Sequence, residues 1–195
     1  MMTDDRLPPL PREAWSNAQR RAADTIIRGP RGGLYGPFVP LLRSPELLDC
    51  AGRMGEYLRY RSALGTRLSE LVILLVARAW DQQVEWAIHA PIALSAGISV
   101  AVVDAIAAGR RPAAMSADEA LVYDFSTELE HDRGVSGDTF ERARTAFGEQ
   151  GVVDLIGLNG YYTFLAMIMN AAQTPVPQSD APPLLVVRRA RRPAR

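Results

Sequence analysis

Three side chains that can bind and transfer protons occur at helical spacing within residues 81–89, DQQVEWAIH. Gln82, Glu85 and His89 are three and four residues apart, so on a helix they lie on one side. Histidine changes charge near neutral pH, and a neighbouring carboxylate tunes its pKa. The glutamine amide can orient a carboxylate or a carbonyl. The set suits general acid–base chemistry on a small polar ligand.

A further carboxylate, Glu70, precedes this segment. It lies in RLSELVILLVARAW (67–80), which is apolar nearly all round and predicts a buried helix, where a carboxylate needs a partner. Alternatively, Glu70 is half solvated near a helix start. For His89 the alternative is a core histidine bonded to a backbone carbonyl. For the Glu85–His89 pair it is a surface contact of about 0.3 kcal/mol.

These residues converge only if the chain turns between them. A single helix would place Glu70 and Gln82 about 18 Å apart along its axis. We therefore predict a break near Asp81, with Asp81 as the N-cap of the second helix. Glu70, Gln82, Glu85 and His89 should then share one pocket under the loop at 32–38, and the carboxylates should raise the pKa of His89.

Arg78 and Arg61 are candidate partners for a substrate carboxylate. The alternative for both is an ordinary surface or interhelix salt bridge.

The elements that must position these residues are helices. Capping residues, glycine stops and 3.6-residue periodicity predict an all-α fold of seven to eight helices, and strand-like alternation is scarce. Residues 1–175 form one predicted domain and 176–195 a Pro/Arg-rich tail. Residues 29–40 are a shaped connector, because they lack the Lys-Ser/Thr ending of a phosphate loop. The expected helices are 12–28, 45–62, 66–80, 82–96, 99–108, 116–132, 137–147 and 150–173.

Composition narrows the functional class. The 195 residues carry 22 basic and 22 acidic side chains, so no net charge favours nucleic acid or a membrane surface. Cys50 is the only cysteine, which excludes an intramolecular disulfide. No signal peptide and no uncharged apolar run of about 18 residues is visible, so we expect a soluble cytoplasmic protein. The tail is either an RNA-binding arm or an extension whose LLVV segment docks on a neighbouring subunit.

The spacing Glu70-x11-Gln82-x2-Glu85-x3-His89 resembles the carboxymuconolactone decarboxylase and AhpD-like superfamily, whose peroxidase branch has the motif Glu-x11-Cys-x2-Cys-x3-His. The resemblance covers roughly residues 8 to 175. It implies an all-α fold and homo-oligomers, often trimers or hexamers, with sites near subunit contacts. The stretches that also fit are RGPRGGLYGPFVPLLRSPEL (28–47), GEYLRYRSALGTRLSELVILLVAR (55–78), EWAIHAPIALSAGIS (85–99) and LIGLNGYYTFLAMIMNA (155–171).

The resemblance implies one of two chemistries. AhpD-like members use the cysteine pair as a dithiol, but Gln82 and Glu85 occupy those positions, and a thiol–disulfide cycle needs two sulfurs. We therefore reject dithiol peroxidase activity. Carboxymuconolactone decarboxylases are lyases that use no cofactor. In such an enzyme His89 would be the general acid or base, Glu85 or Glu70 its orienter, and Gln82 a substrate anchor.

Two other hypotheses stay open. One is a non-catalytic oligomer that binds a small molecule, which the loss of both cysteines favours. The other is a metal site on Glu70, Glu85 and His89.

Overall fold

The computed structural model describes residues 5–179 and residue 184. This part of the chain contains eight α-helices, a 3₁₀ turn (Arg12–Ala14) and no strand, which confirms the predicted fold class. The helices are α1 (Asn17–Arg28), α2 (Phe38–Leu41), α3 (Pro45–Tyr60), α4 (Gly65–Ala79), α5 (Gln83–Ser95), α6 (Val100–Ala107), α7 (Ala117–His131) and α8 (Gly137–Ala172).

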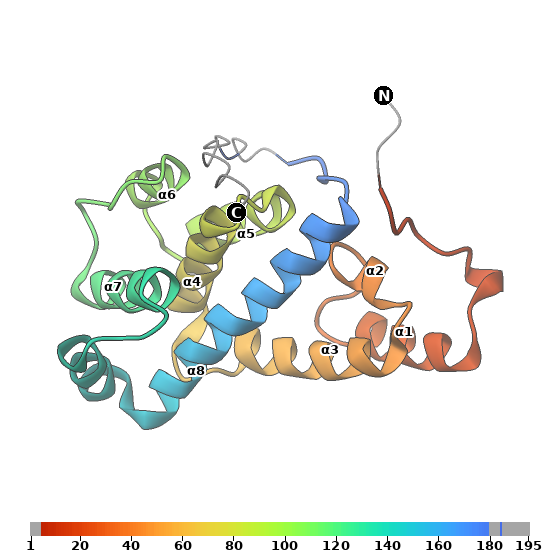
Figure 1. The fold of residues 1–195 in the computed structure, drawn as a ribbon, viewed down its shortest axis with the longest axis horizontal. Helices are drawn as coiled ribbons and strands as arrows, with labels where there is room; N and C mark the ends of the chain where they lie inside the picture. Colours follow the sequence, from red (N-terminus) through yellow and green to blue (C-terminus); the bar gives the residue numbers. More distant parts are fainter. Residues whose placement is uncertain (1–4, 180–183, 185–195) are drawn as a thin grey trace, which may run out of the picture.

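Helix α4 is the centre of the fold. It packs against α3, α5, α6, α7 and α8, and Leu71, Val72, Ile73 and Leu74 are fully buried. A helix that is apolar on every side is stable only when neighbours surround it. Figure 1 shows α8 running across the middle of the molecule, with α1–α3 on one side and α4–α7 on the other. Glu70 is therefore carried by the most enclosed helix.

The chain breaks between α4 and α5, as predicted, but the cap is a different residue. Asp81 has φ = 50°, in the left-handed region, whereas an N-cap needs extended backbone. Gln82 has that backbone, and its side chain accepts a hydrogen bond from the Val84 N–H at 2.7 Å. The Asp81 carboxylate pairs with Arg78 instead. The prediction of Asp81 as the cap is therefore wrong by one residue.

Helix α8 consists of two arms that join at Gly148. This glycine has φ = 70° inside the span Gly137–Ala172, a conformation that glycine adopts without steric cost. The predicted boundary between helices 137–147 and 150–173 falls at this kink. Among the described residues, α8 alone is long and apolar enough to cross a membrane by length and composition, and 56% of that window is buried inside the fold. A buried core helix of a soluble protein can have the same length and composition.

The C-terminal segment runs back along α5. Pro91 has no N–H to donate to the Ala87 carbonyl one turn earlier, and the Ser179 hydroxyl donates to that carbonyl oxygen at 2.7 Å. The Gln83 side chain holds the backbone of Leu184 with two hydrogen bonds of 3.0 Å. Leu184, the first residue of LLVV, is therefore buried on its own chain. Residues 180–183 and 185–195 of the predicted tail lie outside the described residues.

Candidate functional site

His89 lies between two carboxylates. Its Nδ1 is 2.6 Å from Glu70 Oε2, and its Nε2 is 3.2 Å from Glu85 Oε2. The side chains of Glu70, Glu85 and His89 are 1%, 4% and 5% exposed. These values rule out a half-solvated Glu70, a surface Glu85–His89 pair and a histidine bonded to a backbone carbonyl. The three residues form a buried acid–base cluster.

Local structure explains this geometry. Glu85 and His89 are one turn apart on α5, so their side chains meet. Glu70 lies in the second turn of α4, and the short connection at residues 80–82 folds α5 back against α4. Glu70 therefore reaches Nδ1 of His89, whereas Glu85 faces Nε2 on the other side of the ring.

The pKa of His89 is raised above its ordinary value, as the sequence predicted. Burial by itself lowers this pKa, because it disfavours the charged imidazolium. Hydrogen bonds to Glu70 and Glu85, together with their negative charges, outweigh burial. With a carboxylate at each nitrogen, both ring positions suit an N–H donor, which is the arrangement of the protonated ring.

Two arginines that were not expected from the sequence, Arg59 and Arg31, add positive charge beside the cluster. Arg59 Nε on α3 is 3.4 Å from Glu70 Oε1, without the alignment of a hydrogen bond. Arg31, from the glycine-rich loop, stacks over Phe38 at 4.6 Å from the ring centroid. With His89 protonated, the two arginines and His89 give three positive charges against two carboxylates. The cluster therefore favours an anionic ligand.

Two tyrosines of α8 close the other side of the cluster. The ring of Tyr162 meets His89 edge-on at 5.4 Å, and Tyr161 packs edge-on against Tyr162 at 5.3 Å. Burial raises the pKa of Tyr161 to about 12. Gly55 makes room for this arrangement, because a Cβ there would lie 2.1 Å from the Tyr161 hydroxyl and 2.4 Å from Arg31 Nη2. The tyrosines stay neutral near pH 7 and shield the cluster from water.

A small cavity opens beside His89. Its volume is about 30 Å³, enough for about two water molecules or one carboxylate group. Five buried polar atoms in this region lack a hydrogen-bond partner among the described residues, namely Arg31 Nη1, Arg59 Nε, Glu70 Oε1, Glu85 Oε1 and the Tyr161 hydroxyl. A buried polar atom without a partner is costly. The cavity lining is Arg31, Tyr35, Pro37, Phe38, Arg59, Glu85, Ile88, His89, Tyr162 and Leu165.

The predicted convergence holds for three residues of four. Glu70, Glu85 and His89 meet, and the glycine-rich loop covers the cavity through Tyr35, as expected. Gln82 does not line this cavity. Its amide caps α5 and donates to Asn170 Oδ1 of α8 at 2.7 Å. Both ends of the side chain are thus occupied within the protein, so the prediction that Gln82 shares the pocket with the other three residues is wrong.

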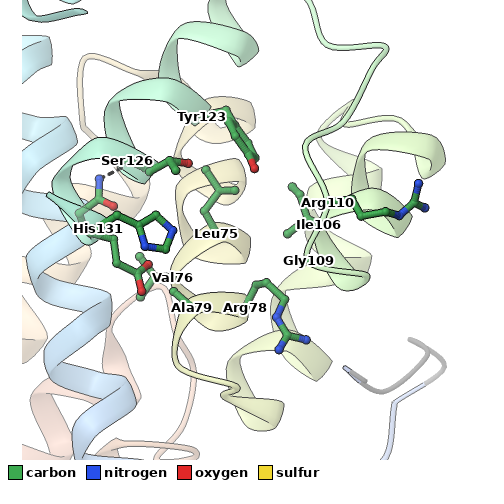
Figure 2. A pocket seen from close by; sticks show the side chains of 13 residues that line it. Leu75, Val76, Arg78, Ala79, Ile106, Gly109, Arg110, Tyr123, Ser126 and His131 are labelled. Carbon is green, nitrogen blue, oxygen red and sulfur yellow. Dashed lines mark hydrogen bonds between the residues drawn. The ribbon is translucent and has the colours of Figure 1, made fainter. Parts of the chain in front are cut away.

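Arg78 and Arg61, the predicted partners of a substrate carboxylate, also lie elsewhere. Arg78 pairs with Asp81 and donates to the Ala107 carbonyl oxygen at 3.3 Å. Figure 2 shows it beside a separate cavity of about 250 Å³ between α4, α6 and α7. Arg61 is exposed and lies 3.8 Å from Glu56. Both arginines make the ordinary salt bridges that the sequence left open as the alternative.

The sequence carries a signal for Arg59 in the small residues of α3. Gly52, Gly55 and Arg59 follow helical spacing on α3, and the two glycines are buried. Small residues mark the face on which helices approach closely, and Arg59 continues that face. Arg61 is two residues further along, on a different side of the helix. Arg31 had no such signal, because it lies in a loop without periodicity.

The arrangement does not favour a metal ion. Within the described residues no group of three or more His, Cys, Asp or Glu side chains is arranged to hold one. Glu70 and Glu85 approach opposite nitrogens of the same ring, so the three side chains do not converge on one point, as metal ligands must.

Comparisons with known proteins give no match of any kind. No family model, no curated protein and no solved structure matches the chain. The site is therefore defined by its own geometry: a histidine between two buried carboxylates, beside a small cavity with two arginines.

Proposed function

We propose that the chain is a cofactor-independent enzyme that performs acid–base chemistry, decarboxylation or lactone processing, on a small substrate with a carboxylate. The observation that carries this proposal is His89 held between Glu70 and Glu85 beside a cavity with unsatisfied arginine nitrogens. The resemblance to the carboxymuconolactone decarboxylase and AhpD-like superfamily supports the proposal at the level of the superfamily, whose decarboxylase members use no cofactor.

The roles that we propose from the geometry differ from those expected from the sequence. Both nitrogens of His89 face carboxylates. Glu70 and Glu85 each have an Oε1 atom without a hydrogen bond, but only Glu85 lines the cavity, so its Oε1 is the atom that a substrate would meet. Arg31 and Arg59 would hold the substrate carboxylate. Glu85 would move a proton to or from the reacting carbon or oxygen. His89 and Glu70 would position Glu85 and balance its charge.

A decarboxylation at this site has a simple proton balance. The electrons of the breaking C–C bond pass into a conjugated carbonyl group of the substrate as carbon dioxide leaves. The protonated His89 would pass its Nε2 proton to Glu85, and Glu85 would deliver a proton to the resulting enolate, which completes the product. The His89–Glu85 pair would then regain one proton from solvent. Positioned proton transfer of this kind contributes about 10²–10⁴-fold to a rate.

The test is a screen of small lactones and unsaturated or β-keto carboxylic acids, with carbon dioxide release and lactone opening as readouts. Glu85→Gln should lower kcat by at least about 100-fold with an unchanged circular dichroism spectrum. Cys50→Ser is the matched control and should keep full activity, because Cys50 is exposed on α3. Loss of activity in Cys50→Ser would revive thiol chemistry.

The same geometry is also compatible with a second function, that of a non-catalytic protein that binds a small acid. It is favoured by the engagement of both His89 nitrogens within the protein. Small acids that raise the melting temperature of the wild-type protein but are not turned over would select this alternative.

A further inference from the structure

A second, larger cavity lies next to the His89 cavity. Its volume is about 320 Å³. Its walls include Val39 from α2, Val84 and Ile88 from α5, and Pro175 and Pro177 after α8. Apolar side chains from three separate parts of the chain therefore meet at this position.

The two cavities lie on adjacent faces of α5. Glu85 and His89, one turn apart, face the small polar cavity, and Val84 and Ile88, also one turn apart, face the apolar one. Tyr35 and Ile88 line both cavities, so these two side chains separate them. Tyr35 is 44% exposed, and its hydroxyl is held by the Arg31 carbonyl oxygen at 2.7 Å. Because Tyr35 is already nearly half exposed, turning its ring toward solvent would break this hydrogen bond but remove few buried contacts.

The walls of the apolar cavity are fixed by hydrogen bonds. Arg43 donates to the carbonyl oxygens of Leu7 and Pro8 at 3.2 and 2.7 Å. The Arg6 backbone N–H donates to the Ala172 carbonyl oxygen at 2.8 Å. The N-terminal segment, whose Asp5 and Pro9 also line the cavity, is thus tied by Arg43 to the residues after α2 and by Arg6 to the end of α8. The cavity is thus part of the folded structure rather than a gap between loose segments.

The sizes of the cavities indicate a ligand with two unlike parts. A cavity of about 150 Å³ lined by apolar side chains accommodates benzene, so 320 Å³ accommodates a group of about ten heavy atoms. The His89 cavity has room for little more than a carboxylate. Binding sites commonly combine a large apolar wall with a few placed polar groups.

We propose that the apolar cavity receives the alkyl or aryl group of an amphiphilic carboxylic acid whose carboxylate lies between Arg31 and Arg59. This inference rests on the proposed function for the carboxylate site and adds the substrate class. Val39, Val84 and Ile88 then select for the apolar group, and Tyr35 marks the passage between head and tail.

The test is calorimetric titration of the full-length protein with butanoate, octanoate and octan-1-ol, below micelle-forming concentrations. Octanoate should bind at least tenfold more tightly than butanoate, because each buried methylene contributes about fourfold in affinity. Octan-1-ol should bind more weakly than octanoate, because it has no charge for the arginines. Arg59→Met should weaken both acids.

Val39→Phe should fill the cavity and reduce the ratio of octanoate to butanoate affinity toward one. Val100→Phe is the matched control, because Val100 is exposed on α6, and it should keep the wild-type ratio. If Val39→Phe does not fold, the ratio of octanoate to butanoate affinity in the wild-type protein decides whether the apolar cavity binds the alkyl group.

The outcomes separate this inference from the proposed function. Acids that bind through Arg59 without any chain-length dependence overturn the apolar site and leave the proposed function standing. Failure of both acids to bind overturns the carboxylate site and the inference with it. If octan-1-ol binds as tightly as octanoate, the arginines do not contribute to binding, and the proposal of a ligand with a carboxylate head and an apolar tail is overturned.

Discussion

His89 takes its properties from residues on other parts of the chain. Glu85 is supplied by its own helix, whereas Glu70 comes from α4 and the Tyr162 ring from α8. Removing water from the ring disfavours charge, and the two carboxylates restore it. The protonated ring is therefore a structural component of the fold as well as part of the proposed site.

The raised pKa of His89 predicts a pH dependence of stability. Below the unfolded-state pKa of about 6.5 the ring is protonated in both states, and the carboxylate pairing contributes fully. As pH rises through the higher folded-state pKa, that contribution is lost. The free energy of unfolding should therefore fall with pH above about 6.5, as measured by urea denaturation at several pH values.

His89→Gln should flatten this dependence. His131→Gln is the matched control, since His131 is exposed at the end of α7 and should leave the slope unchanged. An equal slope in wild type and His89→Gln would contradict the prediction.

At the scale of the elements, α5 depends on distant residues in its first turn and near its middle. Its first turn is capped by Gln82, which is itself held by Asn170 of α8. Asn170 also donates to the Trp80 carbonyl oxygen at 3.0 Å, so α8 holds the turn between α4 and α5. Further along, Pro91 leaves a free carbonyl at Ala87 that the C-terminal segment satisfies. The helix that carries Glu85 and His89 is thus fixed by contacts outside itself.

Replacing the cap should destabilise the protein without affecting ligand binding. Gln82→Ala removes a cap worth about 1 kcal/mol and a second hydrogen bond of about 1 kcal/mol. Ser99→Ala, which removes only the cap of α6, should cost about half as much. Urea denaturation measures both. Loss of acid binding in folded Gln82→Ala would restore Gln82 as a substrate anchor.

The pairing of Pro91 with Ser179 predicts a coupling between two residues far apart in sequence. Ser179→Ala should cost about 1 kcal/mol, because it leaves the Ala87 carbonyl unsatisfied. In a Pro91→Ala background the cost should fall toward zero, because the substituted alanine supplies the missing backbone N–H. A double-mutant cycle by thermal or urea unfolding measures this coupling. Additive effects of the two substitutions would show that they do not share the carbonyl.

At the scale of the whole molecule, one exposed stripe remains on α8. Val153, Ile156, Gly160, Thr163 and Met167 are spaced alternately by three and four residues, the pattern of a helix–helix seam. Val153, Ile156 and Met167 are exposed despite being apolar. The other strongly apolar stretch, residues 71–77, is not available for such a contact, because α4 is enclosed within its own chain.

We predict a homo-oligomer, a trimer or hexamer, that associates through this stripe. Val153→Glu should shift the protein toward the monomer, because a charge in an apolar contact disfavours association. Val100→Glu is the matched control, since Val100 and Val153 are 63% and 66% exposed. Light scattering at micromolar concentration gives the mass of each. A wild-type monomer would refute the prediction.

The sequence by itself determined the features that depend on residues close together along the chain. Helix periodicity and capping residues indicated the all-α fold, and Gly148 indicated the kink in α8. The i,i+4 spacing of Glu85 and His89 paired them, because helix geometry alone brings such side chains together. Glu70 could be added because a charged residue in an apolar helix requires a partner, and a short turn brought its helix alongside.

Only the tertiary structure decided which other side chains reach this cluster. Arg59 rather than Arg61 lies beside Glu70, because packing against α1, α4 and α8 sets how α3 is rotated about its axis. Arg31 arrives from a loop, where no repeat predicts direction, and Gln82 turns to Asn170, a residue far along the chain. Such contacts depend on how helices pack across long sequence separations, and residue types and local spacing do not encode that.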